Sequence, residues 1–143
     1  MQKTIFMVDD NVTNLAKVEE VLEKYYLVIT LSSAAKMFTV LEKVTPDLIL
    51  LDIDMPEMDG LEAIKLLKEH RGYAAIPVIF LTGLTDPDTE AYGIELGAVD
   101  FIAKPFSEPV LLNRIKNHLQ TVDLIREQAA KILELTKKLE APL

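Results

Sequence analysis

Five short apolar runs, each the length of one β-strand, recur along the chain between stretches with helical spacing. They span residues 4–8, 26–31, 47–51, 77–81 and 99–103. Two of them, Leu48–Leu51 and Val78–Leu81, lack the polar alternation of strands that face water, so they are expected at the centre of a sheet with helices on both faces. Strands that alternate with helices form parallel sheets. We therefore predict an α/β fold with a doubly wound sheet of five parallel strands and five helices.

Local signals agree with this alternation. In the third helical stretch, Leu61, Ile64 and Leu67 recur on one face, so Lys65 and Lys68 are expected to turn outward. Residues that can cap helices occur at three of the helical stretches: Asp10, Asn11 and Thr13 at the first, Asp59 before Gly60 at the third, and Asp86 before Pro87 at the fourth.

The last helical stretch is longer than a small domain needs. Helical spacing begins near Glu108, tolerates Pro109 in the first turn, and continues without another glycine or proline to about Glu140. At 1.5 Å per residue, such a helix reaches roughly 50 Å. We therefore predict a domain of residues 1–119 and a helical extension of residues 120–143, which acts as a coiled-coil linker or a dimerisation helix.

The extension carries an apolar stripe within a balanced set of charges. Apolar residues approximate a heptad seam that His118 and Thr136 interrupt: Ile115, Val122, Ile125, Ala129, Ile132 and Leu139. From Gln120 onward, four acidic and four basic residues cancel. This pattern favours pairing with another helix. The alternative is that the extension folds back on its own domain.

The charge of the chain argues against nucleic-acid binding. It carries 23 acidic and 15 basic residues, a formal net charge of -8, whereas contacts with phosphates require clustered Lys and Arg. Without cysteine it forms no disulfide and no thiolate metal site, which is typical of a cytosolic protein. No basic region with a long apolar segment opens the chain, and its apolar runs are too short for membrane spans. We therefore expect one cytoplasmic domain without direct contact with nucleic acid or membrane.

Charged and hydroxyl side chains directly follow or end four of the predicted strands: Asp9 and Asp10 the first, Asp52 the third, Thr82 the fourth and Lys104 the fifth. Each residue alone is typical of a turn, a helix cap or a solvated surface. A parallel sheet, however, gathers the carboxyl ends of its strands along one edge, so these residues are expected to meet. Mg²⁺ prefers oxygen ligands, and we assign Asp10 and Asp52 as direct ligands. Beside the metal, a carboxylate oxygen of Asp52 can attack phosphorus to form an acyl phosphate, while Lys104 and Thr82 stabilise the phosphoryl oxygens.

In order and spacing, these segments resemble the receiver domains of two-component response regulators over about residues 3–119. The matching segments are Val8-Asp9-Asp10, Leu51-Asp52-Ile53-Asp54-Met55-Pro56 followed by Met58-Asp59-Gly60, Leu81-Thr82-Gly83, and Lys104-Pro105-Phe106. The resemblance implies a flavodoxin-like fold with strand order 2-1-3-4-5. It also implies a signalling domain rather than an enzyme, in which Asp52 accepts phosphate from a histidine kinase or a phosphotransfer protein.

The resemblance further implies a role for each residue of the site. Mg²⁺ would be bound by Asp10, Asp52 and the main-chain carbonyl of Asp54, and by Asp9 through water. The phosphoryl oxygens would be contacted by Thr82 and Lys104, and the Lys104–Pro105 peptide bond would be cis.

Two further positions concern the conformational switch and the lifetime of the acyl phosphate. The aromatic switch position of the family is Phe101 here, where many members have tyrosine; Phe can change rotamer but donates no hydrogen bond, and a plain core aromatic is the alternative. Leu84 looks like the position that tunes water access to the acyl phosphate, so we hypothesise slow hydrolysis. Thr82 and Phe101 would together repack the face of the fourth helix, the last strand and the last helix. A homodimer through this face and the extension is expected, as is a C-terminal output domain in a longer protein.

Two other functions compete with this interpretation. Asp52-Ile53-Asp54 also resembles the nucleophile motif of haloacid-dehalogenase-like phosphotransferases, but in that family the nucleophile lies on the first strand and the acidic pair comes late. A phosphorylation-independent interaction module is the other alternative, although every residue that the chemistry requires is present. Nucleotide binding is disfavoured, because the Asp9–Asn14 loop has no glycine and the wrong charge to hold phosphate.

Overall fold

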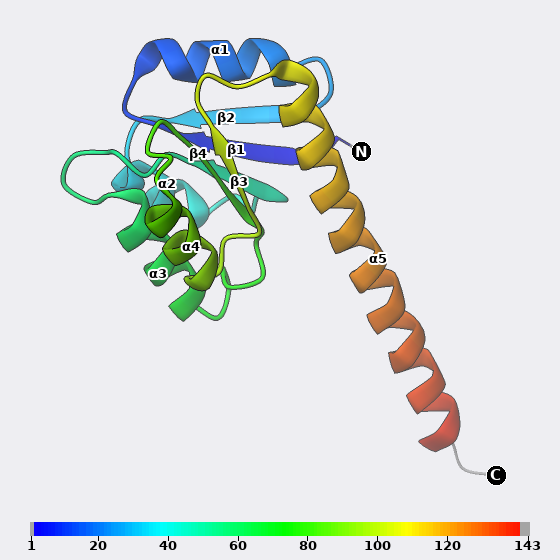
Figure 1. Cartoon of the computed structure of the whole chain (residues 1–143). Coiled ribbons are helices and arrows are strands. Elements are labelled where there is room, and N and C mark those ends of the chain that lie inside the picture. The colour runs from blue at the N-terminus through cyan, green and yellow to red at the C-terminus, as the bar shows by residue number, and fades with distance from the viewer. Residues whose placement is uncertain (1, 141–143) are drawn as a thin grey trace.

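The computed structural model describes residues 2–140, so residues 141–143 of the predicted extension lie outside the described part. Strands and helices alternate strictly (Figure 1). In chain order they are β1 (Thr4–Val8), α1 (Val12–Leu22), β2 (Leu27–Leu31), α2 (Ala34–Leu41), β3 (Leu48–Leu51), α3 (Gly60–Glu69), β4 (Val78–Thr82), α4 (Pro87–Glu95), β5 (Asp100–Ala103) and α5 (Glu108–Glu140). The predicted α/β fold is confirmed. Four strands begin one residue later than the apolar runs, and β4 includes Thr82.

The sheet has the predicted topology. All strands are parallel and lie in the order β2-β1-β3-β4-β5. Val8 is paired with Leu51, Leu51 with Phe80, and Thr82 with Ala103. This register aligns the carboxyl ends of β1, β3, β4 and β5 along one edge. The loops that follow these strands therefore open on the same side of the molecule.

Helices cover both faces of the sheet (Figure 1). On one face, α1 and α5 bury apolar side chains such as Val18 and Ile115. On the other face, α2 and α3 bury side chains such as Met37 and Ile64. Every residue of β3 and β4 is buried between these layers, as predicted for central strands. In α4 only Gly93 is buried, so this helix is attached to the sheet by a small contact.

Each of the first four helices begins at a side chain that accepts a backbone N–H from the first turn. The caps are Asn11 for α1, Ser33 for α2, Asp59 for α3 and Asp86 for α4. Three of these caps were predicted, and Ser33 was not. Such caps satisfy N–H groups that a helix leaves without partners, so they fix the residue at which each helix starts.

The expectation that Lys68 turns outward is wrong. Its ammonium donates to the carbonyls of Ala74 and Ile76, both at 3.0 Å, and its stem lies against Gly97. Burial lowers the pKa of Lys68. A long side chain can cover apolar surface with its methylene groups while its head reaches polar atoms. Lys65 is exposed as expected.

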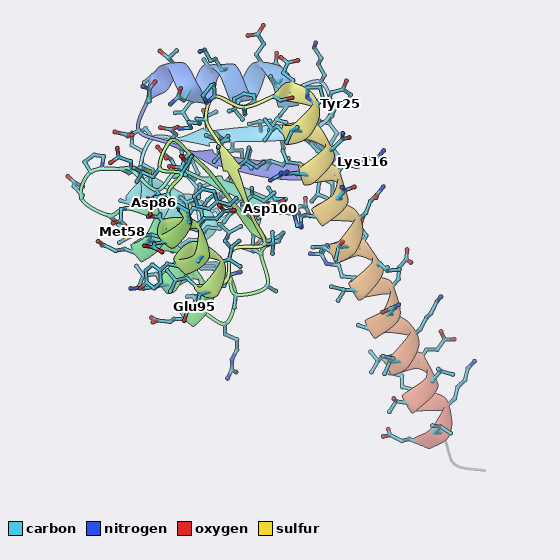
Figure 2. All side chains as sticks on the ribbon, viewed as in Figure 1. Tyr25, Met58, Asp86, Glu95, Asp100 and Lys116 are labelled. Carbon is cyan, nitrogen blue, oxygen red and sulfur yellow. The ribbon has the colours of Figure 1, made fainter. Side chains whose placement is uncertain are left out.

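The last helix projects from the domain without a break (Figures 1 and 2). Its first turns are buried as far as Leu119, and Lys3 then forms an ion pair with Asp123 at 2.7 Å. All residues in the range 124–140 are exposed, so the alternative in which the extension folds back is wrong. Ile115, expected in the heptad seam, packs in the domain core instead. Within residues 2–140, no helix combines the length and the apolar character that crossing a bilayer requires.

Candidate functional site

The predicted site residues lie at the carboxyl edge of the sheet. Asp9 and Asp10 follow β1, Asp52 follows β3, and Lys104 follows β5. These four residues line one cavity with a volume of about 700 Å³, together with Asp54 and Leu84. The aligned strand register accounts for this meeting of residues that are up to 95 positions apart.

Thr82, the last residue of β4, is fully buried behind this cavity. Its hydroxyl oxygen accepts the backbone N–H of Leu84 at 3.2 Å. The hydroxyl proton remains available as a donor, because a hydroxyl can accept and donate at once. Leu84 is 41% exposed and lines the cavity, and its effect on water access to Asp52 stays a prediction.

Three carboxylates converge in the cavity. One oxygen each from Asp9, Asp10 and Asp52 lie within 4.8 Å of one another. Asp9 and Asp52 are buried, whereas Asp10 is exposed. Three negative charges at this separation repel each other unless a cation compensates them. The cluster therefore has the charge and the oxygen atoms of a divalent cation site.

Asp9 is the most strongly held of the three carboxylates. Its Oδ1 accepts the backbone N–H of Asn11 at 2.9 Å. Its Oδ2 accepts the side-chain amide of Asn14 at 3.3 Å and the ammonium of Lys104 at 2.5 Å. Sequence reasoning missed Asn14. The available signal was its place in the first turn of the helix that follows the acidic pair.

Asp52 is in the opposite situation. Its Oδ1 is buried and has no hydrogen-bond partner among residues 2–140, and its Oδ2 lies 3.5 Å from the Lys104 ammonium. Burial raises the pKa of the Asp52 carboxyl, while the Thr82 hydroxyl and the Lys104 ammonium oppose that rise. A buried carboxylate oxygen without a partner is costly, and a metal ion at the cavity would satisfy it. Carboxylate and carbonyl oxygens are the ligands that Mg²⁺ takes, so the donor set fits this ion.

Gly60 lets α3 approach the segment that follows the Asp52 strand. A Cβ at this position would lie 2.3 Å from the Asp52 carbonyl oxygen, and the Gly60 N–H donates to the Ile53 carbonyl at 2.9 Å. No other residue fits at such a distance, because contacts this close do not occur for real side chains. The glycine of Met58-Asp59-Gly60 thus fixes the loop around the acidic cluster.

Phe101 points into the core. Its side chain is buried, and its ring lies 6.0 Å from that of Phe80 at an angle of 57°. This is the arrangement of a core aromatic residue, and a switching role for Phe101 stays a prediction. The peptide bond between Lys104 and Pro105 is cis, as the resemblance implied.

Comparisons with known proteins agree on one family. The family model described as "Response regulator receiver domain" matches residues 5–116. Among curated relatives, a "Probable cyclic di-GMP phosphodiesterase" of Vibrio cholerae is 44% identical over 119 residues, which are 83% of this chain and 27% of that protein. The "Alkaline phosphatase synthesis transcriptional regulatory protein PhoP" of Bacillus subtilis is 34% identical over 125 residues, 87% of this chain and 51% of PhoP.

Solved structures show the same likeness. A putative response regulator from Chloroflexus aurantiacus superposes with a TM-score of 0.80 at 31% identity, covering 84% of this chain and 99% of that one. NtrX from Brucella abortus gives a TM-score of 0.83 at 28% identity, covering 91% of this chain and 29% of NtrX. The chain spans about half or less of the length of the two curated relatives described above.

Proposed function

This chain belongs to the family of response regulator receiver domains, which act in two-component signalling, and we propose that Asp52 is the residue that accepts the phosphoryl group. The observation that carries the proposal is the buried Asp52 oxygen without a hydrogen-bond partner, beside two further carboxylates and one ammonium. The bonding capacity of this carboxylate is therefore not used up by donors of the described residues. Its surroundings supply the opposite charge that a phosphoryl group requires.

The transfer proceeds by attack of an Asp52 carboxylate oxygen on phosphorus. The bond between phosphorus and the donor breaks, and its electron pair stays with the donor, a phosphorylated histidine of a histidine kinase or phosphotransfer protein. Asp10, Asp52 and the main-chain carbonyl of Asp54 would hold Mg²⁺, with Asp9 contributing through water. When bound, the ion neutralises charge on the phosphoryl oxygens. Because Asp52 itself keeps the phosphoryl group while the other residues position and stabilise it, the domain is a signalling switch rather than an enzyme with multiple turnovers.

Lys104 and Thr82 hold the phosphoryl group after transfer. Lys104 already lies between Asp9 and Asp52, so a small movement brings its ammonium to a phosphoryl oxygen. The Thr82 hydroxyl donates to another oxygen, and that inward movement draws in residues 83–87 of the following loop. Phe101, which packs on Phe80 two residues before Thr82, can then change its position.

The surface of α4, β5 and α5 carries the change to partners. A hollow of about 370 Å³ on this surface is lined by residues that include Phe101, Val110 and Arg114. On the same face, Asp100 of β5 pairs with Arg114 at 3.1 Å and with His118 at 2.9 Å, so β5 and α5 are linked. Because Gly93, the buried residue of α4, lies against Phe80, a change in the packing of Phe80 and Phe101 is transmitted to this helix.

The extension pairs with the same helix of a second copy. Ile125, Ile132 and Leu139 are spaced by seven residues, and at least 60% of each is exposed. Charged residues lie on the other sides of the helix, so the apolar face carries no net charge and is complementary to itself. A coiled-coil dimer of this kind links the state of the domain to an output module in a longer cytoplasmic regulator, as the length of the curated relatives supports.

The experiment that tests phosphoryl transfer is intact-mass spectrometry after incubation with Mg²⁺ and acetyl phosphate. Wild type is expected to gain one phosphoryl group, and Asp52→Asn none. Asp88→Asn, which changes an exposed acid in α4, serves as the matched control and is expected to behave as wild type. Repeated hydrolysis of the donor by a protein that gains no mass would instead support a haloacid-dehalogenase-like phosphotransferase. No reaction in any variant would support a phosphorylation-independent interaction module.

A further inference from the structure

Asn14 is fixed in place beside the acidic cluster. It lies in the first turn of α1, where its backbone N–H donates to the side chain of Asn11 at 3.1 Å. This cap sets the position of the Asn14 backbone, and the side chain turns back toward β1 to reach Asp9 at 3.3 Å. The cap thus fixes the backbone of Asn14, and the hydrogen bond to Asp9 fixes its side chain.

The Asp9 carboxylate depends on three donors. It is fully buried, so its charge requires hydrogen bonds from the protein. The Asn11 N–H occupies Oδ1, and Oδ2 is shared between the amide of Asn14 and the ammonium of Lys104. The same ammonium lies 3.5 Å from Asp52. The hydrogen bond from the Asn14 amide to Oδ2 therefore influences how strongly Asp9 attracts the Lys104 ammonium.

Asn14 and Lys104 also line the same two cavities. Both line the acidic cavity, and both line an adjoining groove of about 500 Å³ between α1 and the start of α5. The two side chains thus lie where these hollows adjoin. A change at Asn14 acts directly on the surroundings of Lys104.

We propose that Asn14 is a positioning residue that shares Asp9 Oδ2 with Lys104 and so keeps the ammonium between Asp9 and Asp52. The proposal rests on the function proposed for Asp52. Without the Asn14 amide, Oδ2 has Lys104 as its sole donor among residues 2–140, so the ion pair between Asp9 and Lys104 becomes stronger. The ammonium is then less free to move toward the phosphoryl position and competes more strongly with a cation for Asp9.

The test is a double-mutant cycle in metal-free protein, followed by urea unfolding. Asn14→Ala is expected to lower the urea midpoint by about 0.5 M in wild type. In the Lys104→Met background the same change should lower it at least about twice as much, because Oδ2 then has no donor. Asn14→Leu, which keeps the volume of the side chain but not its donor, should behave like Asn14→Ala. Thr13→Ala, an exposed neighbour in the same turn, is the control and should leave the midpoint unchanged.

Calorimetric titration with Mg²⁺ provides a second reading. Asn14→Ala is expected to weaken Mg²⁺ binding about fivefold in wild type and not to weaken it in Lys104→Met, because the competing ammonium is gone. A merely structural role for Asn14 predicts equal effects in both backgrounds, in urea and with Mg²⁺, and that result would overturn the proposal.

The proposal and the function of Asp52 fail in different ways. If wild type gains no phosphoryl group, phosphoryl transfer is refuted. If the effects of Asn14→Ala and Lys104→Met on stability and Mg²⁺ affinity are nevertheless non-additive, the role of Asn14 is supported. If wild type gains the phosphoryl group and the effects of the two substitutions are additive, only the role of Asn14 is refuted.

Discussion

The Lys104 ammonium lies 2.5 Å from Asp9 Oδ2, whereas its nearest approach to Asp52 is 3.5 Å. Under the proposed function, the cation that holds the phosphoryl group is thus bound to the neighbouring carboxylate before phosphorylation. Phosphoryl transfer would then exchange this ion pair for a new one of similar kind. An exchange between two ion pairs changes the free energy less than the formation of one ion pair from water, which suits a reversible switch.

Lys104→Met separates two functions of this residue. Removal of the ammonium relieves the competition for Asp9, so Mg²⁺ should bind up to about tenfold more tightly. Phosphorylation by acetyl phosphate should become about 100-fold slower, because the phosphoryl oxygens lose a positive charge. Calorimetry and intact-mass time courses measure the two effects. Lys17→Met, which removes an exposed charge from the groove between α1 and α5, is the control and should change Mg²⁺ affinity and phosphorylation rate by no more than about twofold. Weaker Mg²⁺ binding in Lys104→Met would show that Lys104 and Mg²⁺ do not compete for Asp9.

Asp52→Asn should stabilise the metal-free protein at neutral pH. Burial raises the pKa of Asp52 in the folded state, so its contribution to stability is complete below the ordinary carboxyl range and is lost as pH rises through the folded-state pKa. At pH 7 the charged form therefore costs stability, and the variant should unfold with a free energy about 1 kcal/mol higher. Urea unfolding at pH 7 and near pH 4 in a chelator should show that the difference shrinks at the lower pH.

Saturating Mg²⁺ should reverse this order, because the wild type gains binding energy that the variant lacks. A variant that is less stable than wild type in chelator at pH 7 would show that burial of Asp52 carries no such cost.

Gly93→Ala should destabilise the domain although alanine favours helices. A Cβ at Gly93 would lie 2.9 Å from a ring carbon of Phe80, which is fully buried and has little room to move. The clash costs about 1–3 kcal/mol, and the helix propensity of alanine returns about 1 kcal/mol, so a net loss is expected. Gly83→Ala is the matched control, because nothing lies within 4 Å of a Cβ there. Thermal unfolding compares the two variants with wild type. A melting temperature of Gly93→Ala above those of wild type and Gly83→Ala would mean that α4 moves aside and relieves the clash.

Ile132→Glu should abolish pairing of the extension. The charge would lie at the centre of the apolar face, where a partner helix buries it without compensation. Wild type is expected to show a dimer mass in light scattering, with or without phosphorylation of Asp52, and the variant a monomer mass. Ala130→Glu places the same charge on the opposite side of the helix and should leave the dimer intact. A wild type that stays monomeric at every concentration would refute self-pairing.

The positions of the strands and of the acidic cluster could be predicted because both follow from local signals. Apolar runs mark the strands, and parallel pairing alone brings Asp9, Asp52 and Lys104 to one edge. The partners of each side chain could not be predicted in this way. Lys104 pairs more closely with Asp9 than with Asp52, but the two nitrogen–oxygen distances differ by only about 1 Å. The hydrogen bond from Asn14 depends on the side-chain rotamer that this residue adopts in the first turn of the helix.

Lys68 and the extension show the same limit at longer range. Lys68 occupies a position that helical periodicity assigns to solvent, yet its ammonium finds two carbonyls on a loop that the sequence does not place. Where α5 leaves the domain, Lys3 pairs with Asp123, which is 120 positions away in the sequence. Neither contact has a signature in the pattern of apolar and polar residues.

The ion pair between Lys3 and Asp123 lies where α5 leaves the domain, and the exposed part of the helix beyond it can act as a rigid arm that turns about this pivot. Beyond this pivot the helix continues to Glu140, a distance of about 25 Å at 1.5 Å per residue. A tilt of about 10° at the pivot therefore displaces the far end by about 4 Å, several times more than the side-chain movements in the acidic cavity. In the proposed switch, a rearrangement of ångström size around Asp52 that tilts the helix would in this way be amplified into a displacement large enough to change the packing of any structure joined to the helix end.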